Sequence, residues 1–449
     1  MSGSRRCSRS LGVLALAAHL LAWPALAAER EIDEAPAPGS AGEIKTPMRR
    51  VFEGVREHGP LFSWLRQQFE GLPPFFADTQ LDVRYRTYYL RQDRTSGTLR
   101  EAWAMGGSLR YRSGWLADIF AVEAEGFTSQ PIVAPEDRGD TRLLQPVQED
   151  INVLGIANGK LRYGGVVLTG YRQYLDLPYV NRRDNRMIPN TFESITLAKP
   201  EGDLRFSTGY SWKIKTRSSD EFESFTKTVG LDKDRGLAHG GAVWNPNENF
   251  HLGAIGSAVP DLYAGLYAET SAAHDFENGL EVRVDSQFTY QWEIGEDLLG
   301  PSLDDTWNLG VRTAASYAGV VFRLGVSVTG SGSSIFGPYG TNPSYVDLMQ
   351  RAFNRADEKA LLASLSYDFS HLGVDGLTLI ANFVAGFDGE LLGVRDDAQE
   401  VDATLDYRIP EGWFRGFWLR IRGSWLNEES AGRDASDVRV ILRYDFPVI

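Results

Sequence analysis

Alternation between apolar and polar residues with a period of two is the feature that most restricts how this chain can fold. In LDVRYRTYY (81–89), Val83 and Tyr85 fall on one face, and Arg84 and Arg86 fall on the other. The same pattern returns in three later segments, 204–217, 280–292 and 437–446. Because successive side chains of a β-strand point to opposite faces, this period predicts strands, and about eighteen such segments occur between residues 81 and 448.

The connections between these segments alternate in length. Short turns such as YGGV, PNEN and YAGV alternate with long polar stretches at 129–150, 175–193, 218–236 and 331–359. A single alternating segment fits a soluble β-sandwich, but two unequal rims and aromatic residues at the strand ends are typical of outer-membrane barrels. We therefore expect an all-β fold, a transmembrane antiparallel β-barrel of about 18 strands with short periplasmic turns and long extracellular loops.

The N-terminal part of the chain has a different composition. Residues 1–28 combine three arginines, an apolar stretch at 11–21 and the small residues Ala-Leu-Ala before the expected cleavage point, which predicts a signal peptide. Residues 29–75 are acidic and rich in Pro and Ala at first and then patchily amphipathic. They predict a partly disordered periplasmic extension with one or two short helices, followed by the barrel at 76–449.

Charge and cysteine content limit the classes of function that the chain can have. The chain has 46 Lys and Arg against 60 Asp and Glu, a net charge of −14, which disfavours nucleic acid as a partner because nucleic-acid binding needs a basic surface. The one cysteine, Cys7, lies in the predicted signal peptide. After the signal peptide no run of 18 or more apolar residues occurs, so no transmembrane helix is expected.

Residue patterns for catalysis and metal binding are missing from the sequence. The histidines after the signal peptide are isolated and lack metal-ligand spacing: His58, His239, His251, His274 and His371. Neither a G-x-S-x-G motif nor a phosphate-binding loop occurs. The expectation is therefore a protein without a cofactor, a metal or catalytic residues, and an outer-membrane enzyme is disfavoured.

Basic residues gather on the face that would line the barrel lumen. If apolar residues face lipid, the first two and last three strands, which become neighbours on closure, place nine arginines inward. They are Arg84, Arg86, Arg110, Arg112, Arg408, Arg420, Arg422, Arg439 and Arg443. Lumen walls carry scattered charge in any case, but a strip of this kind would concentrate and guide carboxylates.

Two long segments carry a family resemblance. PYVNRRDNRMIPNTFE (178–193) and FGPYGTNPSYVDLMQRAFNRADEKA (336–360), supported by YRSGWLAD (111–118), resemble the OprD-type (Occ) substrate-specific porins of Gram-negative outer membranes. The resemblance runs from about Phe75 to the C-terminus. It implies a monomeric barrel of eighteen strands whose third and seventh extracellular loops, here 175–193 and 335–359, fold inward to form a constriction.

The resemblance also implies an arginine ladder with an electronegative patch opposite. Physically, loop side chains offer fixed polar contacts, although each of them has a purely structural reading, such as an Asp184–Arg186 pair that pins the loop. The candidate constriction residues are Tyr179, Arg182, Arg183, Asp184, Arg186, Tyr339, Tyr345, Asp347 and Asp357.

The expected function is facilitated diffusion of small carboxylates, with those substrates and outer-membrane lipid as partners. In the family, one branch takes basic amino acids and the other takes aromatic or other organic acids. Acidic loops at 220–224 and 295–305 would attract cations, whereas the arginine strip favours anions, so the substrate stays open. The alternatives are a general non-selective porin and an adhesive or structural barrel with a closed pore.

Overall fold

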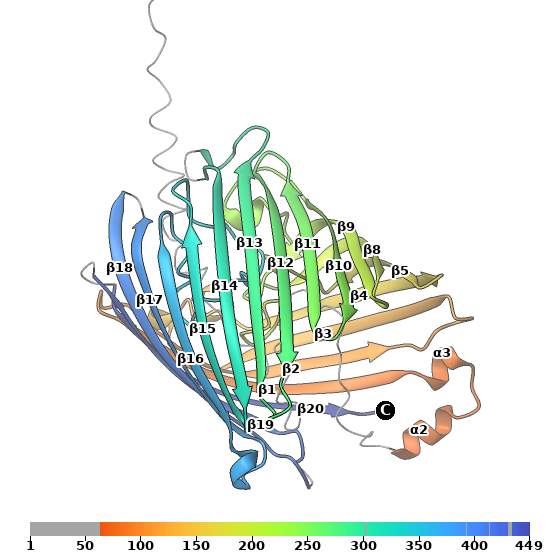
Figure 1. Cartoon of the computed structure of the whole chain (residues 1–449). Helices are drawn as coiled ribbons and strands as arrows, with labels where there is room; N and C mark the ends of the chain where they lie inside the picture. Colours follow the sequence, from red (N-terminus) through yellow and green to blue (C-terminus); the bar gives the residue numbers. More distant parts are fainter. Residues whose placement is uncertain (1–62, 301–302, 392, 413, 430–432) are drawn as a thin grey trace, which may run out of the picture.

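Eighteen antiparallel strands close into a barrel between Gln80 and Pro447 (Figure 1). The computed structural model describes residues 63–300, 303–391, 393–412, 414–429 and 433–449. Each strand pairs with the one before it in the chain, and the last strand pairs with the first, which closes the sheet. The prediction of an antiparallel barrel of eighteen strands is confirmed. The predicted signal peptide and most of the 29–75 extension lie outside the described residues.

The strands of the barrel are β1 (Gln80–Arg94), β2 (Leu99–Arg112), β3 (Phe120–Val133), β4 (Ile151–Tyr163), β5 (Val166–Gln173), β8 (Thr191–Lys199), β9 (Leu204–Lys215), β10 (Leu237–Asn247), β11 (Phe250–Val259), β12 (Tyr263–Asp275), β13 (Glu281–Glu293), β14 (Thr306–Tyr317), β15 (Val320–Thr329), β16 (Lys359–Asp368), β17 (Leu377–Leu391), β18 (Val394–Arg408), β19 (Trp418–Glu428) and β20 (Ala435–Pro447). The remaining elements are a small hairpin of β6 (Asp176–Leu177) and β7 (Val180–Asn181), the helices α2 (Ser63–Phe69) and α3 (Pro74–Ala77), and the 3-10 helices η3 (Glu136–Arg138), η4 (Pro146–Gln148), η5 (Lys227–Val229) and η7 (Phe369–Leu372).

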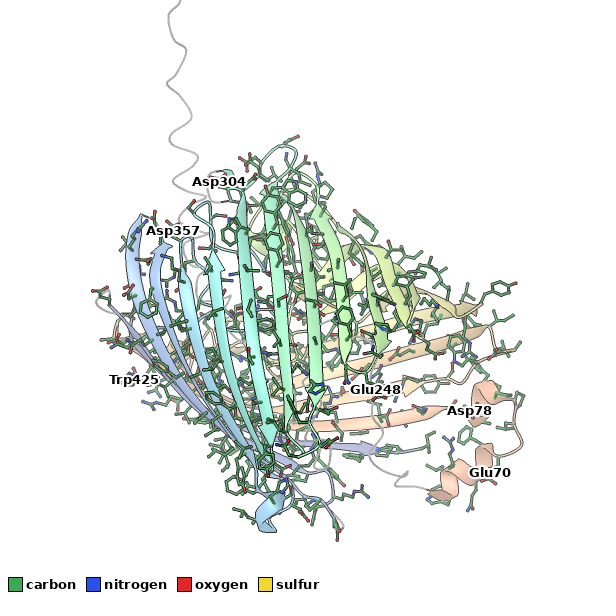
Figure 2. All side chains as sticks on the ribbon, in the orientation of Figure 1. Glu70, Asp78, Glu248, Asp304, Asp357 and Trp425 are labelled. Atoms are coloured by element: carbon green, nitrogen blue, oxygen red, sulfur yellow. The ribbon has the colours of Figure 1, made fainter. Side chains whose placement is uncertain are left out.

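The register of the sheet explains the alternation in the sequence. Across the closure Tyr85 pairs with Tyr444 and Arg86 pairs with Arg443, so aromatic residues meet on one face and arginines meet on the other. Large apolar side chains are exposed on the outer wall, and Trp425 on β19 is an example (Figure 2). An outer face of this kind suits contact with lipid, because every strand also finds its hydrogen-bonding partners inside the closed sheet.

The two rims differ as predicted. On one rim the strands join through turns such as 164–165, 248–249 and 318–319. Figure 2 labels Glu248 on this rim. On the other rim lie the long connections that we call loop 2 (134–150), loop 3 (174–190), loop 4 (216–236), loop 6 (294–305) and loop 7 (330–358). Connections such as 95–98 and 260–262 on that rim are nevertheless short.

The two described helices lie next to the short-turn rim, beside the start of β1 (Figure 1). The amide of Gly114, in the turn between β2 and β3, donates to the carbonyl of Phe75 at 3.0 Å. A Cβ atom on Gly114 would lie 2.0 Å from the carbonyl oxygen of Pro74, so this contact requires glycine. Neither helix is long and apolar enough to cross a membrane.

Apolar residues inside the barrel belong mainly to the loops and to the wall segments beneath them. One cluster joins Tyr179 of loop 3, Phe225 of loop 4 and Tyr339 of loop 7 to the wall. A second joins Leu143 of loop 2 and Ile188 of loop 3 to Tyr88 on β1 and to other wall residues. A third packs loop 7 against β16 to β20. The loops are therefore held inside the barrel by burial of apolar surface.

Candidate functional site

Loop 3 crosses the interior of the barrel. It leaves β5, forms the β6–β7 hairpin and places Tyr179 against the wall at β12 and β13. The Tyr179 hydroxyl forms a hydrogen bond of 2.7 Å with the hydroxyl of Thr289, and its ring meets that of Tyr267 edge to face at 6.2 Å. All three side chains are buried. Tyr179 thus anchors the loop rather than facing open water.

The following part of loop 3 returns to β1. The Asp184 carboxylate lies 2.7 Å from a guanidinium nitrogen of Arg86 and 3.3 Å from one of Arg84. Burial alone would raise the pKa of Asp184, but the positive charges of Arg86 and Arg84 outweigh it and hold that pKa below its ordinary value. Asp184 does pin the loop, but its partners are arginines on the wall.

The remaining loop 3 arginines have separate partners. Arg186 is buried and donates from Nε to the carbonyl oxygen of Thr141 in loop 2 at 2.9 Å. Arg183 is buried as well. Arg182 donates from Nε to Asp176 at 2.7 Å, and its side chain keeps 42% of its surface exposed. Of these three, Arg182 is the one that presents its charge to the interior space.

Loop 7 is hydrogen-bonded directly to loop 3. The side-chain amide of Asn181 donates to the carbonyl of Thr341 at 2.9 Å, and the Thr341 amide donates back to Asn181 Oδ1 at 2.8 Å. The buried Tyr339 donates its hydroxyl proton to the carbonyl of Phe225 in loop 4 at 3.0 Å. Loops 3, 4 and 7 therefore form one connected layer within the barrel.

The far part of loop 7 reaches β18. The Glu400 carboxylate accepts hydrogen bonds from the backbone amides of Gln350 at 2.8 Å and Arg351 at 3.0 Å. Tyr345 is buried, with the guanidinium carbon of Arg312 lying 4.5 Å from its ring centre.

The two loop 7 aspartates named from the sequence lie in different places. Asp347 is a buried carboxylate in the middle of the loop. Asp357 pairs with Arg395 at 3.1 Å on the long-loop rim (Figure 2). Its side chain keeps 34% of its surface exposed, so Asp357 is a rim residue.

The nine arginines named from the sequence do lie on adjacent strands, but they fall into groups. Four are buried to 3% exposure or less: Arg86, Arg420, Arg422 and Arg439. Arg420 forms a bidentate pair with Asp406 at 2.7 and 2.8 Å, and Arg439 forms one with Asp437 at 2.8 and 2.9 Å. Acidic residues therefore balance much of this part of the strip.

Three other arginines are nearer the short-turn rim. Arg112 pairs with Asp82 at 2.7 Å, and Arg443 donates from Nε to Asp445 at 2.7 Å. Arg408 ends β18 at this rim. The strip thus runs along the wall from one rim toward the loops, with carboxylates interleaved along its length.

Three arginines with partly exposed side chains lie around Tyr174 at the start of loop 3. Arg84 and Arg110 keep 27% and 29% of their side-chain surface exposed, less than the 42% of Arg182. The guanidinium carbons of Arg110 and Arg182 lie 5.6 and 4.6 Å from the centre of the Tyr174 ring. We call Arg84, Arg110, Arg182 and Tyr174 the arginine group.

Tyr174 also has a polar role in the arginine group. Its hydroxyl donates to Glu125 at 2.9 Å, and burial together with the Glu125 carboxylate raises the pKa of Tyr174 well above its ordinary value. The hydroxyl is therefore protonated at neutral pH. Two partly exposed arginine side chains beside one aromatic ring form a site that can bind an anion weakly.

Sequence reasoning missed three parts of this arrangement. Loops 2 and 4 pack against loop 3, and the apolar pair Leu143 and Leu144 of loop 2 was a visible signal within a polar stretch. Tyr174 was not named. The alternation in β18 also places a row of carboxylates on the inner face, directly beside the arginines of β19: Asp396, Glu400, Asp402 and Asp406.

The next question is whether side chains are grouped for metal binding or for acid–base chemistry. Within the described ranges no three His, Cys, Asp or Glu side chains are grouped as a metal ion requires. His251 lies on the inner wall, with Nε2 2.7 Å from Glu269 and Nδ1 2.6 Å from the side-chain oxygen of Asn245. The histidine is buried and its contacts are structural.

Comparison with known proteins gives a consistent result. Residues 73–448 match the family described as outer membrane porin, OprD family. Porin D of Pseudomonas aeruginosa is 22% identical over 410 residues, which cover 84% of this chain and 92% of that protein. The matched region begins after α2, so that helix precedes the part shared with the family.

Solved structures show the same fold. OccK9 (OpdG) of Pseudomonas aeruginosa superimposes with a TM-score of 0.77 at 23% identity, covering 83% of this chain and 99% of that one. OpdK of the same species, solved with vanillate, gives a TM-score of 0.75 at 21% identity, covering 83% of this chain and all of that one.

Proposed function

This chain belongs to the outer membrane porin, OprD family, and on that premise we propose that it admits small carboxylate-bearing molecules selectively. As a member it is a porin of the Gram-negative outer membrane, a channel and not an enzyme. The finer proposal is that loops 3 and 7 form the constriction, and that the arginine group binds the substrate carboxylate during passage.

The observation that carries this proposal is the exposure of the arginine group. The side chains of Arg84, Arg110 and Arg182 keep 27%, 29% and 42% of their surface exposed beside loop 3, whereas Arg420 and Arg439 are buried and paired with Asp406 and Asp437. In a narrow passage with low-dielectric walls, a fixed positive charge raises the local concentration of anions. Because each guanidinium already has a carboxylate partner, a substrate competes for it and is released readily, as conduction requires.

The relatives add a chemical hint. One structural neighbour, OpdK, was solved with vanillate, which is an aromatic carboxylate. At 21% identity this likeness shows the shared fold. That the present chain also admits aromatic carboxylates is part of the proposal.

The proposal extends to the whole chain. Residues 1–28 act as a signal peptide, 29–75 remain on the periplasmic side, and the barrel at 76–449 works as a monomer. Small carboxylates and outer-membrane lipid are its partners. The buried loop residues Tyr179, Arg183, Arg186, Tyr339, Tyr345 and Asp347 fix the loops, and Asp357 acts at the rim.

Uptake into proteoliposomes tests the proposal with matched substrates. Benzoate is compared with its uncharged amide, benzamide, and arginine is compared with agmatine, which lacks the carboxylate. The carboxylate is expected to speed entry in both pairs. Replacing Arg182 by Gln should slow benzoate several-fold, because a charge-assisted hydrogen bond contributes about 1.5–3 kcal/mol.

Arg323→Gln is the matched control. Arg323 lies on the inner face of β15, where it donates to Ser366 at 3.4 Å, away from the arginine group. Its loss should leave the preference for benzoate over benzamide unchanged. Equal entry within both pairs would contradict the proposal in favour of a general porin, and no entry of any solute would indicate a closed, adhesive barrel.

A further inference from the structure

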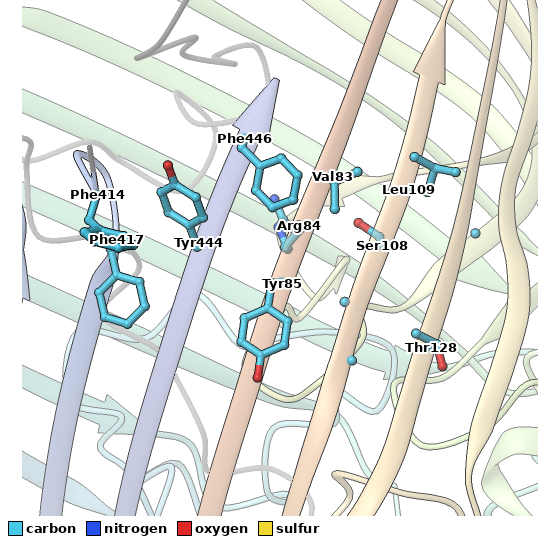
Figure 3. Close-up of a pocket in the computed structure, with 13 residues that line it drawn as sticks. Val83, Arg84, Tyr85, Ser108, Leu109, Thr128, Phe414, Phe417, Tyr444 and Phe446 are labelled. Carbon is cyan, nitrogen blue, oxygen red and sulfur yellow. The ribbon is translucent and has the colours of Figure 1, made fainter. Parts of the chain in front are cut away.

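An apolar groove lies on the outer wall of the barrel near the short-turn rim (Figure 3). It has a volume of about 740 Å³ and runs over β20, β1, β2 and β3. A volume of this size is within the range of about 300–1,000 Å³ that small-molecule sites occupy. The lining is almost wholly apolar; Arg84 contributes to it, but the guanidinium group of Arg84 contacts Asp184 and Asp445.

The floor of the groove is empty because glycines stand where other strands carry large side chains. Gly107 pairs with Tyr85 on one side and Thr128 on the other, and Gly126 pairs with Leu109 and Leu154. Leu109 and Leu154 are about half exposed on the outer wall, so the wall is recessed between them.

Gly107 is fixed by the backbone itself. Its φ is +141°, and a Cβ atom would lie 1.8 Å from the carbonyl oxygen of Arg84. At Gly126, in contrast, the nearest atom to an added Cβ is 4.0 Å away. The recess at Gly126 therefore has room for a larger side chain, which the glycine lacks.

One side of the groove is built from aromatic rings. The ring centres of Phe417 and Tyr444 are 6.3 Å apart, and those of Tyr444 and Phe446 are 5.5 Å apart. Figure 3 shows this row facing Val83, Leu109 and Thr128 across the recess. Phe414 extends the row into the turn between β18 and β19, where its side chain is 67% exposed and the next residue, Arg415, is exposed too.

The position of the groove identifies its occupant. It opens on the lipid-facing wall of an outer-membrane barrel, and its open end lies at the rim of short turns, which is the periplasmic side in such barrels. An apolar groove that begins at the membrane interface and continues toward the bilayer centre runs parallel to a lipid acyl chain and has the same apolar character. Arg415 stands at the interface end, where a lipid phosphate lies.

We infer that this groove is a binding site for a phospholipid of the periplasmic leaflet. One acyl chain lies over Gly107 and Gly126 against the aromatic row, and the phosphate contacts Arg415. The site is independent of the lumen and of the substrate that passes through it. The retained lipid covers apolar surface that the glycines leave exposed, and burial of this surface stabilises the bound lipid.

Filling the recess tests the inference. The full-length protein and Gly126→Phe are incorporated into phosphatidylglycerol nanodiscs and released into mild detergent. Phosphatidylglycerol retained by each protein is then counted by native mass spectrometry. The wild type is expected to retain about one lipid, and the variant to bind it about tenfold more weakly, the factor that about 1.4 kcal/mol produces.

Gly423→Phe is the matched control. Gly423 also lies on the lipid-facing side, since it pairs with the exposed Val438, and the nearest atom to an added Cβ there is 3.9 Å away. It does not line the groove. Its retention of lipid should equal that of the wild type, and both variants should keep the heat-dependent gel shift of a folded barrel.

Phe414→Ala is a second variant that removes part of the wall without filling the recess, and it should also lower retention. Equal retention by the wild type and both groove variants would overturn the inference. So would a crosslinked pair of chains that Gly126→Phe abolishes, because that would make the groove a contact between copies. Recovery of lipid binding only after removal of residues 29–62 would assign the groove to that segment instead.

Discussion

Asp184 holds together two parts of the molecule that are separated by about a hundred residues of sequence, loop 3 and the first strand of the barrel. Its carboxylate contacts Arg86 and Arg84, and the pKa of Asp184 is lowered from its ordinary value of 3.8. A lowered pKa in the folded state means that the ionised form is the one that stabilises the fold. This contribution is complete above the ordinary value and disappears as the pH falls through the lowered one.

The first prediction concerns this pH dependence. In the wild type, the free energy of unfolding should decrease between about pH 5 and pH 2 as Asp184 takes up a proton. Asp184→Asn lacks the titrating group and should be less stable at neutral pH, but it should lose less stability over the same range. Urea unfolding at a series of pH values, followed by tryptophan fluorescence, measures both effects.

Asp445→Asn is not a suitable control because Asp445 also contacts Arg84. Asp375, an exposed residue in the turn before β17, serves instead. If Asp184→Asn and the wild type lose stability in parallel as the pH falls, the ion pair does not account for the acid sensitivity.

The second prediction concerns Gly107. Its positive φ and the 1.8 Å approach to the Arg84 carbonyl leave no place for a Cβ atom. Gly107→Ala should therefore destabilise the barrel by about 1–3 kcal/mol or more, the cost of a strained backbone position. Gly170→Ala is the matched control on β5, where nothing lies within 4 Å of an added Cβ, and it should stay near the wild type. Equilibrium refolding into detergent micelles from urea measures both.

At the scale of the element, the strands were predictable because each obeys a local rule. The alternation around Val83 and Arg84 depends only on the backbone period, so the strand count, the two faces and the closure between β1 and β20 could be read from the sequence. The turns were predictable for the same reason, since residues such as Gly164 and Gly165 adopt positive φ in a tight connection.

The loops were predictable in location but not in path. Nothing local to Tyr179 indicates that it reaches Thr289, because that contact spans the barrel and depends on the diameter of the whole sheet. For the same reason the sequence placed Arg420 and Arg439 on the inner face without indicating that both are buried, or that Arg439 reaches the carbonyl of Met349 in loop 7. The pairing of these arginines with Asp406 and Asp437 required the register between strands.

The third prediction concerns the attachment of loop 7 to β18. The buried Glu400 side chain accepts two backbone hydrogen bonds from this loop, and each such bond contributes about 0.5–1.5 kcal/mol. Glu400→Ala should release the loop, raise the single-channel conductance and weaken discrimination between benzoate and benzamide. Glu429→Ala, an exposed residue just beyond β19, is the control and should change neither. Planar-bilayer recordings would contradict the attachment if both variants conduct alike.

At the scale of the whole molecule, negative charge is exposed at the long-loop rim and the positive charge of the arginine group lies deeper in the barrel. The long-loop rim carries exposed carboxylates in loops 4 and 6, including Asp232 and Glu296. Asp304 is labelled on this rim in Figure 2, whereas the arginine group lies inside the barrel. Exposed charges act on approaching solutes over roughly 30 Å at 0.01 M salt but only about 3 Å at 1 M. Charges within the barrel are screened much less.

The fourth prediction follows from this depth difference. As salt rises from about 0.01 M to 1 M, the ratio of anion to cation permeability should increase. Salt screens the acidic rim first, so the arginine group then determines the ion selectivity. Reversal potentials under a fixed concentration gradient measure the ratio at each mean concentration. A ratio that stays constant would mean that rim and interior contribute equally at all salt concentrations.

The apolar clusters beneath the loops make the interior of this barrel resemble a small water-soluble protein held inside a membrane protein. The two parts are stabilised differently: the wall by its closed ladder and the surrounding bilayer, the layer of loops by ordinary burial. The layer of loops therefore has its own, lower threshold for local unfolding. Under mild stress the channel would first become a leak, wider and indiscriminate, while its wall remained intact.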